Sequence, residues 1–261
     1  TNLTDAIDLG TITTAALTVG AGGDITQTGV STISGLSSFT AGANAITLNQ
    51  ANDFTGAVSL SNSGANNVVI DDANDLVLGT VTIAAGNFTV DNAGTITQTG
   101  AVSVGGNTVL DNEDGSDADI TLTNTGNVFT GTVTFTTDAA SDISITDTTA
   151  FDLLALTVNS LNVSAGGDIS DSGALDIAGT AGFTTTGSNG NVALDQASDI
   201  DGALSVTTHG TGTTSVTNLT DAIDLGAITT AALTISAAGA VSDSGVLDIG
   251  GAAGFTTTGS N

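Results

Sequence analysis

Residues 79–83 read GTVTI, a glycine followed by alternating small polar and apolar residues, and this pattern returns along the whole chain. It occurs as GAVSL (56–60), GAVSV (100–104), GTVTF (131–135), GALDI (173–177), GALSV (202–206) and GVLDI (245–249). Alternation places the apolar residues on one face of a strand and the others on the opposite face. A strand of five residues cannot bury its apolar face alone, so the pattern predicts strands stacked in register about 4.8 Å apart.

A longer repeat contains these strands. The decapeptide TNLTDAIDLG at 1–10 returns at 217–226, and the offset of 217 − 1 = 216 is three times 72. GFTTTGSN (182–189) returns at 254–261, an offset of 254 − 182 = 72. A third set, with offsets of 71, 73 and 72, consists of DITQTG (24–29), TITQTG (95–100), DISDSG (168–173) and AVSDSG (240–245). The chain therefore holds about three and a half copies of a 72-residue unit.

Each unit divides again at its strands. From Gly29 onward the starts of the motif are separated by steps of 27, 23 and 21, then 31, 23 and 19, then 29, 24 and 19. The recurring order indicates three coils per unit, each averaging about 24 residues. A β-propeller fits poorly, because one motif is shared by all three coils. We expect an all-β parallel β-helix (β-solenoid) with about three coils per repeat.

The predicted solenoid is a single domain over residues 1–261, a segment of a longer repeat array. Its units would be approximately 1–72, 73–147, 148–218 and a partial unit at 219–261. One continuous internal ladder is expected from the apolar pairs Val58/Leu60, Val81/Ile83, Val102/Val104, Val133/Phe135, Leu156/Val158, Leu175/Ile177, Leu204/Val206 and Leu247/Ile249.

Composition limits the classes of partner. The chain has 27 acidic residues, no lysine or arginine and a formal charge of −27. Nucleic acids and anionic membranes are excluded as partners, because phosphate binding needs basic side chains. The charge favours solubility and cation binding. No cysteine is present to form disulfides, and no apolar run is long enough to insert into a membrane.

The stretches LNQANDFTGAVSLSNSGANNVVIDDANDLVLGTVTI (48–83) and LDQASDIDGALSV (194–206) resemble the repeats of giant bacterial surface proteins. These are the filamentous-haemagglutinin-like adhesins and related autotransporter passenger domains. The resemblance implies a right-handed β-helix exported to the cell surface, where it would serve as a fibre, stalk or adhesin shaft.

An acidic loop, DNEDGSDAD (111–119), is the first candidate site. Its carboxylates are Asp111, Glu113, Asp114, Asp117 and Asp119. Five carboxylates in nine residues suit a hard cation, so we consider Ca2+ as a ligand, although the spacing is not that of an EF-hand. The alternative is a solvated acidic loop without a bound ion.

Two further surfaces are distributed along the chain. Aspartates that precede many of the strands are first of all turn formers that bond their own backbone, and they also predict cation-dependent stability: Asp5, Asp8, Asp24, Asp53, Asp75, Asp152, Asp168, Asp199, Asp221 and Asp224. The outward residues of the motif, from Thr11/Thr13 to Ala227/Thr229, would form one flat strip. That strip could pack against a neighbouring copy, bind ice, or simply be solvated.

Catalysis finds little support in the sequence. His209 is the only histidine, and it lacks a cysteine or basic neighbour for a nucleophile–base pair. Asp71, Asp72 and Asp75 could act as paired carboxylates of a glycosidase, but similar acids recur throughout. We expect no enzyme. The sequons at 2–4, 87–89, 162–164 and 218–220 permit glycans.

The expected function is structural: the cation-stabilised shaft or subunit of an extracellular bacterial filament or adhesin. Its partners would be copies of itself, end to end or side by side. A ligand- or calcium-binding adhesin module remains the alternative, and an ice-binding or glycan-degrading β-helix is a weaker one.

Overall fold

The computed structural model describes residues 4–112 and 117–259 of the 261-residue chain. All regular structure in these residues is β-strand, and all strand pairings are parallel. Among them there is accordingly no helix long and apolar enough to cross a membrane. The expected all-β parallel solenoid is confirmed.

The chain forms two compact units, Thr1–Asp138 and Ala139–Asn261. The strands of unit 1 are β1 (Ile7–Leu9), β2 (Ile12–Thr14), β3 (Leu17–Gly20), β4 (Ile25–Gln27), β5 (Ser31–Ile33), β6 (Ser37–Thr40), β7 (Ile46–Phe54), β8 (Val58–Asn62), β9 (Val68–Asp72), β10 (Leu76–Ile83), β11 (Phe88–Asn92), β12 (Ile96–Gln98), β13 (Val102–Val104), β14 (Thr108–Asp111), β15 (Ile120–Leu122), β16 (Val128–Phe129) and β17 (Val133–Thr136).

The strands of unit 2 are β18 (Asp142–Asp147), β19 (Phe151–Leu153), β20 (Leu156–Val158), β21 (Ser160–Ala165), β22 (Ile169–Asp171), β23 (Leu175–Ile177), β24 (Ala181–Thr185), β25 (Val192–Ile200), β26 (Ala203–Thr207), β27 (Thr214–Asn218), β28 (Ile223–Thr230), β29 (Leu233–Ala237), β30 (Val241–Asp243), β31 (Leu247–Ile249) and β32 (Ala253–Thr257).

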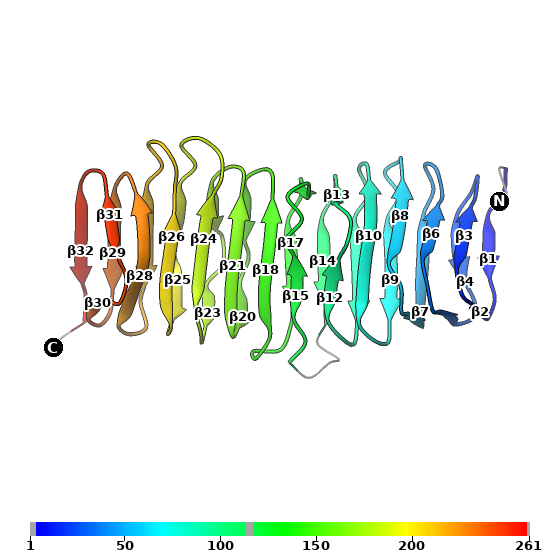
Figure 1. Cartoon of the computed structure of the whole chain (residues 1–261), viewed down its shortest axis with the longest axis horizontal. Coiled ribbons are helices and arrows are strands. Elements are labelled where there is room, and N and C mark those ends of the chain that lie inside the picture. Colours follow the sequence, from blue (N-terminus) through cyan, green and yellow to red (C-terminus); the bar gives the residue numbers. More distant parts are fainter. Residues whose placement is uncertain (1–3, 113–116, 260–261) are drawn as a thin grey trace. The chain divides into compact units, whose positions relative to one another are not determined.

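Each unit is built from two main sheets, sheet 1 and sheet 2, joined along one side by a short corner face. In unit 1, sheet 1 contains β1, β4, β7, β9, β11, β14 and β17, and sheet 2 contains β3, β6, β8, β10, β12, β13, β15 and β16. In unit 2, sheet 1 contains β19, β22, β25, β27, β29 and β32, and sheet 2 contains β18, β21, β24, β26, β28, β30 and β31. The corner face pairs β2, β5 and β7 in unit 1 and β20, β23 and β25 in unit 2. Within each unit, Figure 1 shows successive turns side by side.

One turn of the solenoid is shorter than the motif spacing suggests. In sheet 1 of unit 1, the paired positions step from Ile7 to Ile25, Ile46, Val68, Phe88, Thr108 and Val133, so the residue number rises by 18, 21, 22, 20, 20 and 25. The estimate of about three turns per repeat holds, and the register refines it to about three and a half turns per repeat unit.

The extra half turn moves each repeat to the opposite sheet. Within unit 1, DITQTG contains β4 of sheet 1, whereas TITQTG contains β12 of sheet 2. Within unit 2, DISDSG contains β22 of sheet 1, whereas AVSDSG contains β30 of sheet 2. Both sheets therefore display the same repeated sequence in alternation.

The predicted single ladder of apolar pairs is wrong for the same reason. Val58/Leu60, Val81/Ile83 and Val102/Val104 do stack in sheet 2 of unit 1, but Val133 and Phe135 pair with Thr108 and Leu110 in sheet 1. In unit 2, Leu156/Val158 and Leu175/Ile177 stack on the corner face, and Leu204/Val206 lie in sheet 2. The motif reports which side of a strand is buried, and it does not report which sheet the strand joins.

The interior is nevertheless formed by the residues that the alternation selects. β8 and β9 alternate strictly between buried and half-buried positions. Phe39 and Phe54 are fully buried, with ring centroids 6.1 Å apart in an edge-to-face arrangement. Small branched side chains fill the rest of the interior, as expected for a narrow space between two sheets.

Candidate functional site: outward carboxylates on successive turns

Three aspartates of unit 2 meet at the turn that follows β25. In the stretch DIDG (199–202), Ile200 is fully buried, so strand alternation directs Asp199 and Asp201 outward. Asp221 comes from the next turn of the solenoid, just before β28. One carboxylate oxygen from each aspartate lies within 4.8 Å of the other two. We call this group the aspartate triad.

Like charges accumulate around the triad. Asp176 of β23 pairs in register with Asp199. The pKa of Asp201 is raised above its ordinary value, chiefly by the charge of Asp199, then by desolvation and by the charges of Asp221 and Asp176. The Thr220 hydroxyl donates a hydrogen bond to Asp199. With no lysine or arginine in the chain, compensation of these charges has to come from the solvent.

The geometry of the triad suits a hard cation. Calcium takes carboxylate oxygens at 2.3–2.6 Å, so one ion placed between oxygens that lie within 4.8 Å of one another could contact all three aspartates. Asp201 and Asp221 are exposed and Asp199 is half-buried, so water could complete the coordination sphere. The triad is therefore the candidate cation site of the described residues.

The acidic loop predicted to bind calcium is only partly described. Glu113 and Asp114 lie outside the described residues. Asp117 is exposed with a backbone φ of 57°, and Asp119 is also exposed. The described acids of the loop do not belong to a group with the close oxygen spacing of the triad. Calcium binding by the loop stays a prediction.

A row of carboxylates leads into this loop. Asp71, Asp91 and Asp111 occupy paired positions at the ends of β9, β11 and β14. In-register strands lie about 4.8 Å apart, which leaves neighbouring charges with a repulsion of somewhat under ~1 kcal/mol even in water. The sequence analysis treated these acids singly, whereas the structure aligns them on consecutive turns.

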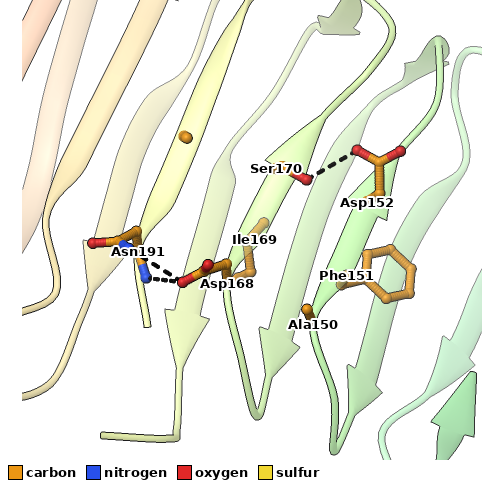
Figure 2. Close-up of a pocket in the computed structure, with 8 residues that line it drawn as sticks. Ala150, Phe151, Asp152, Asp168, Ile169, Ser170 and Asn191 are labelled. Carbon is orange, nitrogen blue, oxygen red and sulfur yellow. Dashed lines mark hydrogen bonds between the residues drawn. The ribbon is translucent and has the colours of Figure 1, made fainter. Parts of the chain in front are cut away.

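A second arrangement of carboxylates recurs with the repeat. Asp152 accepts hydrogen bonds from Ser170 Oγ at 3.0 Å and from Ser172 Oγ at 2.7 Å on the next turn. Figure 2 shows Asp152 and Ser170 beside a shallow hollow of about 390 Å³ that Asp168 and Asn191 also line. The equivalent groups are Asp8 with Thr26 and Thr28, and Asp224 with Ser242 and Ser244.

Other predicted turn aspartates also bond to the following turn, not to their own. The backbone N–H groups of Ala45, Thr95 and Asn191 donate to Asp24 at 2.9 Å, Asp75 at 2.9 Å and Asp168 at 2.7 Å, respectively. The expectation that these side chains bond their own backbone is therefore wrong. They connect neighbouring turns, because the next turn presents unpaired N–H groups at the same corner.

The remaining sequence candidates are separated by the fold. The outward motif residues do not form one strip, because Thr13 lies in β2 on the corner face, Ser59 in β8 of sheet 2 and Thr134 in β17 of sheet 1. His209 is exposed, and its Nδ1 lies 2.7 Å from the carbonyl oxygen of Thr185.

The four sequons differ in access. Asn218 is fully buried, so the sequon at 218–220 cannot carry a glycan in the folded chain. Asn87 and Asn162 are exposed, and Asn2 lies outside the described residues.

The sequence analysis missed the triad as a cluster, although it singled out Asp199 and Asp221. The signal that could have found it is their offset in the numbering, 221 − 199 = 22, which corresponds to one turn of the solenoid. Because the turn length taken from the motif spacing was too long, that correspondence was not apparent.

A family model described as repeats of unknown function (DUF5649) matches residues 1–61, 65–136, 140–207 and 211–261. The chain belongs to the DUF5649 repeat family. No curated protein and no solved structure matches it. The four DUF5649 segments cover nearly the whole chain, so the triad and the carboxylate–hydroxyl groups are features of the repeats themselves.

Proposed function

We propose that this DUF5649-repeat chain is a structural subunit or shaft of an extracellular bacterial filament or adhesin, without catalysis. The observation that carries the proposal is the recurrence of the same register between repeats. In unit 1, Ile7 pairs with Ile25, Ile12 with Ser31 and Leu17 with Ser37. In unit 2, the equivalent positions pair in the same way, Ile223 with Val241, Ile228 with Leu247 and Leu233 with Ala253.

Such recurrence supports a structural role for a physical reason. Each turn presents the next one with the same backbone edge and the same alternating interior, so stability grows by adding copies. An enzyme needs one place where the pattern is interrupted by converging reactive groups. The carboxylate–hydroxyl groups around Asp8, Asp152 and Asp224 recur instead of converging.

The extracellular setting rests on resemblance and charge. The stretches at 48–83 and 194–206 resemble bacterial surface adhesin repeats, and a cysteine-free chain of charge −27 suits a salt- and calcium-rich exterior. We propose copies of the same repeat as the partners, end to end through strand edges and side by side through outward faces.

Electron microscopy of the natively assembled protein, with and without a calcium chelator, tests this function. The proposal expects filaments or long shafts built from many turns, shortened or frayed by the chelator. Discrete particles of the size of one chain, unchanged in either buffer, would rule out the structural role.

A second function, divalent cation binding, is favoured specifically by the aspartate triad. Titration calorimetry with Ca2+ should detect a site that the substitution Asp201→Asn weakens at least tenfold. Asp248→Asn is the matched control, because Asp248 of β31 is exposed and lies outside the triad. Equal Ca2+ binding by both variants and the parent chain would remove the triad as a site and leave the acidic loop at 111–119 as the remaining candidate.

A further inference from the structure

One corner of unit 1 contains an acid in a column of amides. Asn52, Asp72 and Asn92 occupy paired register positions at the ends of β7, β9 and β11, and Asn112 follows on the next turn. The side chains of all four are at most 1% exposed. Asp72 is the one carboxyl group at these four positions.

The amides of the column use their nitrogen atoms as donors. Asn92 Nδ2 donates to the carbonyl oxygens of Gly94 and Thr95, and Asn112 Nδ2 donates to that of Ala118 at 2.6 Å. Asn52 Nδ2 donates to the carbonyl oxygen of Asp71 at 2.9 Å. At Asp72 the place of the amide nitrogen is taken by a second oxygen, which carries no hydrogen when the group is ionised.

Two buried acceptors at this corner consequently lack a donor. Asp72 Oδ1 accepts from the N–H of Phe54 at 2.9 Å, but Asp72 Oδ2 has no hydrogen-bond partner. Asn92 Oδ1, on the neighbouring turn, has none either. Each atom has less than 1 Å² of accessible surface, which leaves no space for a bridging water. A single hydrogen placed between the two turns would satisfy both oxygens.

The surroundings of Asp72 disfavour its ionised form. The acids around it are Asp53 on β7, Asp71 on β9, Asp75 before β10 and Asp91 on β11, and the chain has no basic side chain except His209 of unit 2. Burial raises the pKa of Asp72 to about 6, the Phe54 hydrogen bond lowers it, and Asp53, Asp71 and Asp75 raise it further.

We propose that Asp72 is a pH-sensitive latch between turns, held as the neutral acid with its Oδ2 proton donated to Asn92 Oδ1, and that ionisation of Asp72 weakens the attachment of β9 to β11. The direction follows from proton binding. The pKa of about 6 in the folded chain exceeds the ordinary value of 3.8, so the folded state holds the proton more strongly. The stabilising effect is complete below pH 3.8 and is lost as the pH rises through 6.

The test compares the full chain with its Asp72→Asn variant, in which the amide supplies the missing hydrogen at every pH. Below pH 4 the two unfold alike. At pH 8 the variant should have an unfolding constant up to about a hundredfold smaller, since each unit of pKa shift corresponds to a factor of ten. Asp91→Asn, which removes an exposed charge from the adjacent strand, is the control and should show no such pH-dependent gain.

Carbon NMR of the unmodified chain provides a second readout that does not depend on the folding of a variant. The Asp72 carboxyl carbon should titrate near pH 6, and hydrogen exchange of the Phe54 amide should slow below that pH. Titration near pH 4, or an Asp72→Asn chain that unfolds like the parent at pH 8, would overturn the latch.

Discussion

At the residue scale, the interior is organised by polar side chains that complete one another across turns. Gln27 and Asn52 exchange two hydrogen bonds, of 2.6 and 3.2 Å, and Asn52 Oδ1 also accepts from the N–H of Ser31 at 2.9 Å. Gln98 and Asn127 form the same reciprocal pair one repeat later, at 2.8 and 2.9 Å. A buried amide is tolerated only when its donors and acceptors are paired, so these pairs fix which turns are neighbours.

We predict that Asn52→Ala lowers the free energy of unfolding by about 2–3 kcal/mol, because it leaves Gln27 and the Ser31 N–H without partners inside the protein. Asn49→Ala, at an exposed position of the same strand, should change it by less than about 0.5 kcal/mol. Chemical denaturation of both variants measures the difference. Equal effects would mean that the buried pair contributes little.

In the third repeat the amide pair is replaced by Asp171 and Ser198. Burial raises the pKa of Asp171, while the backbone N–H groups of Asp195 and Gln196 oppose that shift. Because the folded state binds this proton more strongly than the unfolded state, the contribution of Asp171 to stability is lost as the pH rises.

The double substitution Asp171→Gln, Ser198→Asn should rebuild the amide pair and raise the free energy of unfolding by about 1 kcal/mol at pH 8. The gain should shrink in acid, where Asp171 is protonated anyway. Thermal melts of the two single variants and the double variant at pH 4 and 8 check this. A double variant no better than the sum of the singles would show that the pair does not form.

At the scale of the strand, the long strands β10 and β28 share one device. In both, the burial pattern contains two adjacent buried residues, Leu78–Gly79 and Leu225–Gly226, and the register of the pairing shifts near the glycine. A Cβ on Gly79 or Gly226 would collide with the hydroxyl of Ser59 or Ser205 on the preceding turn. Glycine therefore lets a single strand pass from one buried face to the next.

The half-turn offset of the repeat gives a prediction for pairs of strands. With no native cysteine in the chain, cysteines can be introduced in pairs and joined with a short cross-linker. Thr82 and Ser103 are paired in register in sheet 2 and should cross-link efficiently. Ser103 and Thr134 occupy the same place in the GAVSV and GTVTF motifs but lie in different sheets, so they should not. Comparable yields from both pairs would restore the single ladder.

At the scale of the whole molecule, 27 carboxylates without a basic partner make stability depend on the ionic medium. Rows such as Asp71, Asp91 and Asp111 place like charges on consecutive turns, well within the ~10 Å screening length of 0.1 M salt. The melting temperature should rise steadily with sodium chloride between about 10 mM and 0.5 M. Calcium should raise it further at equal ionic strength. A melting temperature independent of salt would mean that the charges are already compensated.

The sequence by itself determined the fold class, the repeat and which side of most strands is buried. Those properties are local: alternation along one strand separates Val58 and Leu60 from Ser59, whatever the strand pairs with. Identical words in successive repeats also guaranteed identical local register, as the equivalent pairings of Ile7 and Ile223 confirm.

Only the tertiary structure decided the length of a turn, the sheet that each strand joins, and the neighbours of each polar side chain. Turn length depends on how much of the chain leaves the strands at each corner, and the uneven spacing of the motif does not reveal that length. The aspartate triad and the Asp72 latch both depend on it. Their members become neighbours because the turn is shorter than the motif spacing suggests, and this shorter turn brings their backbone edges into register.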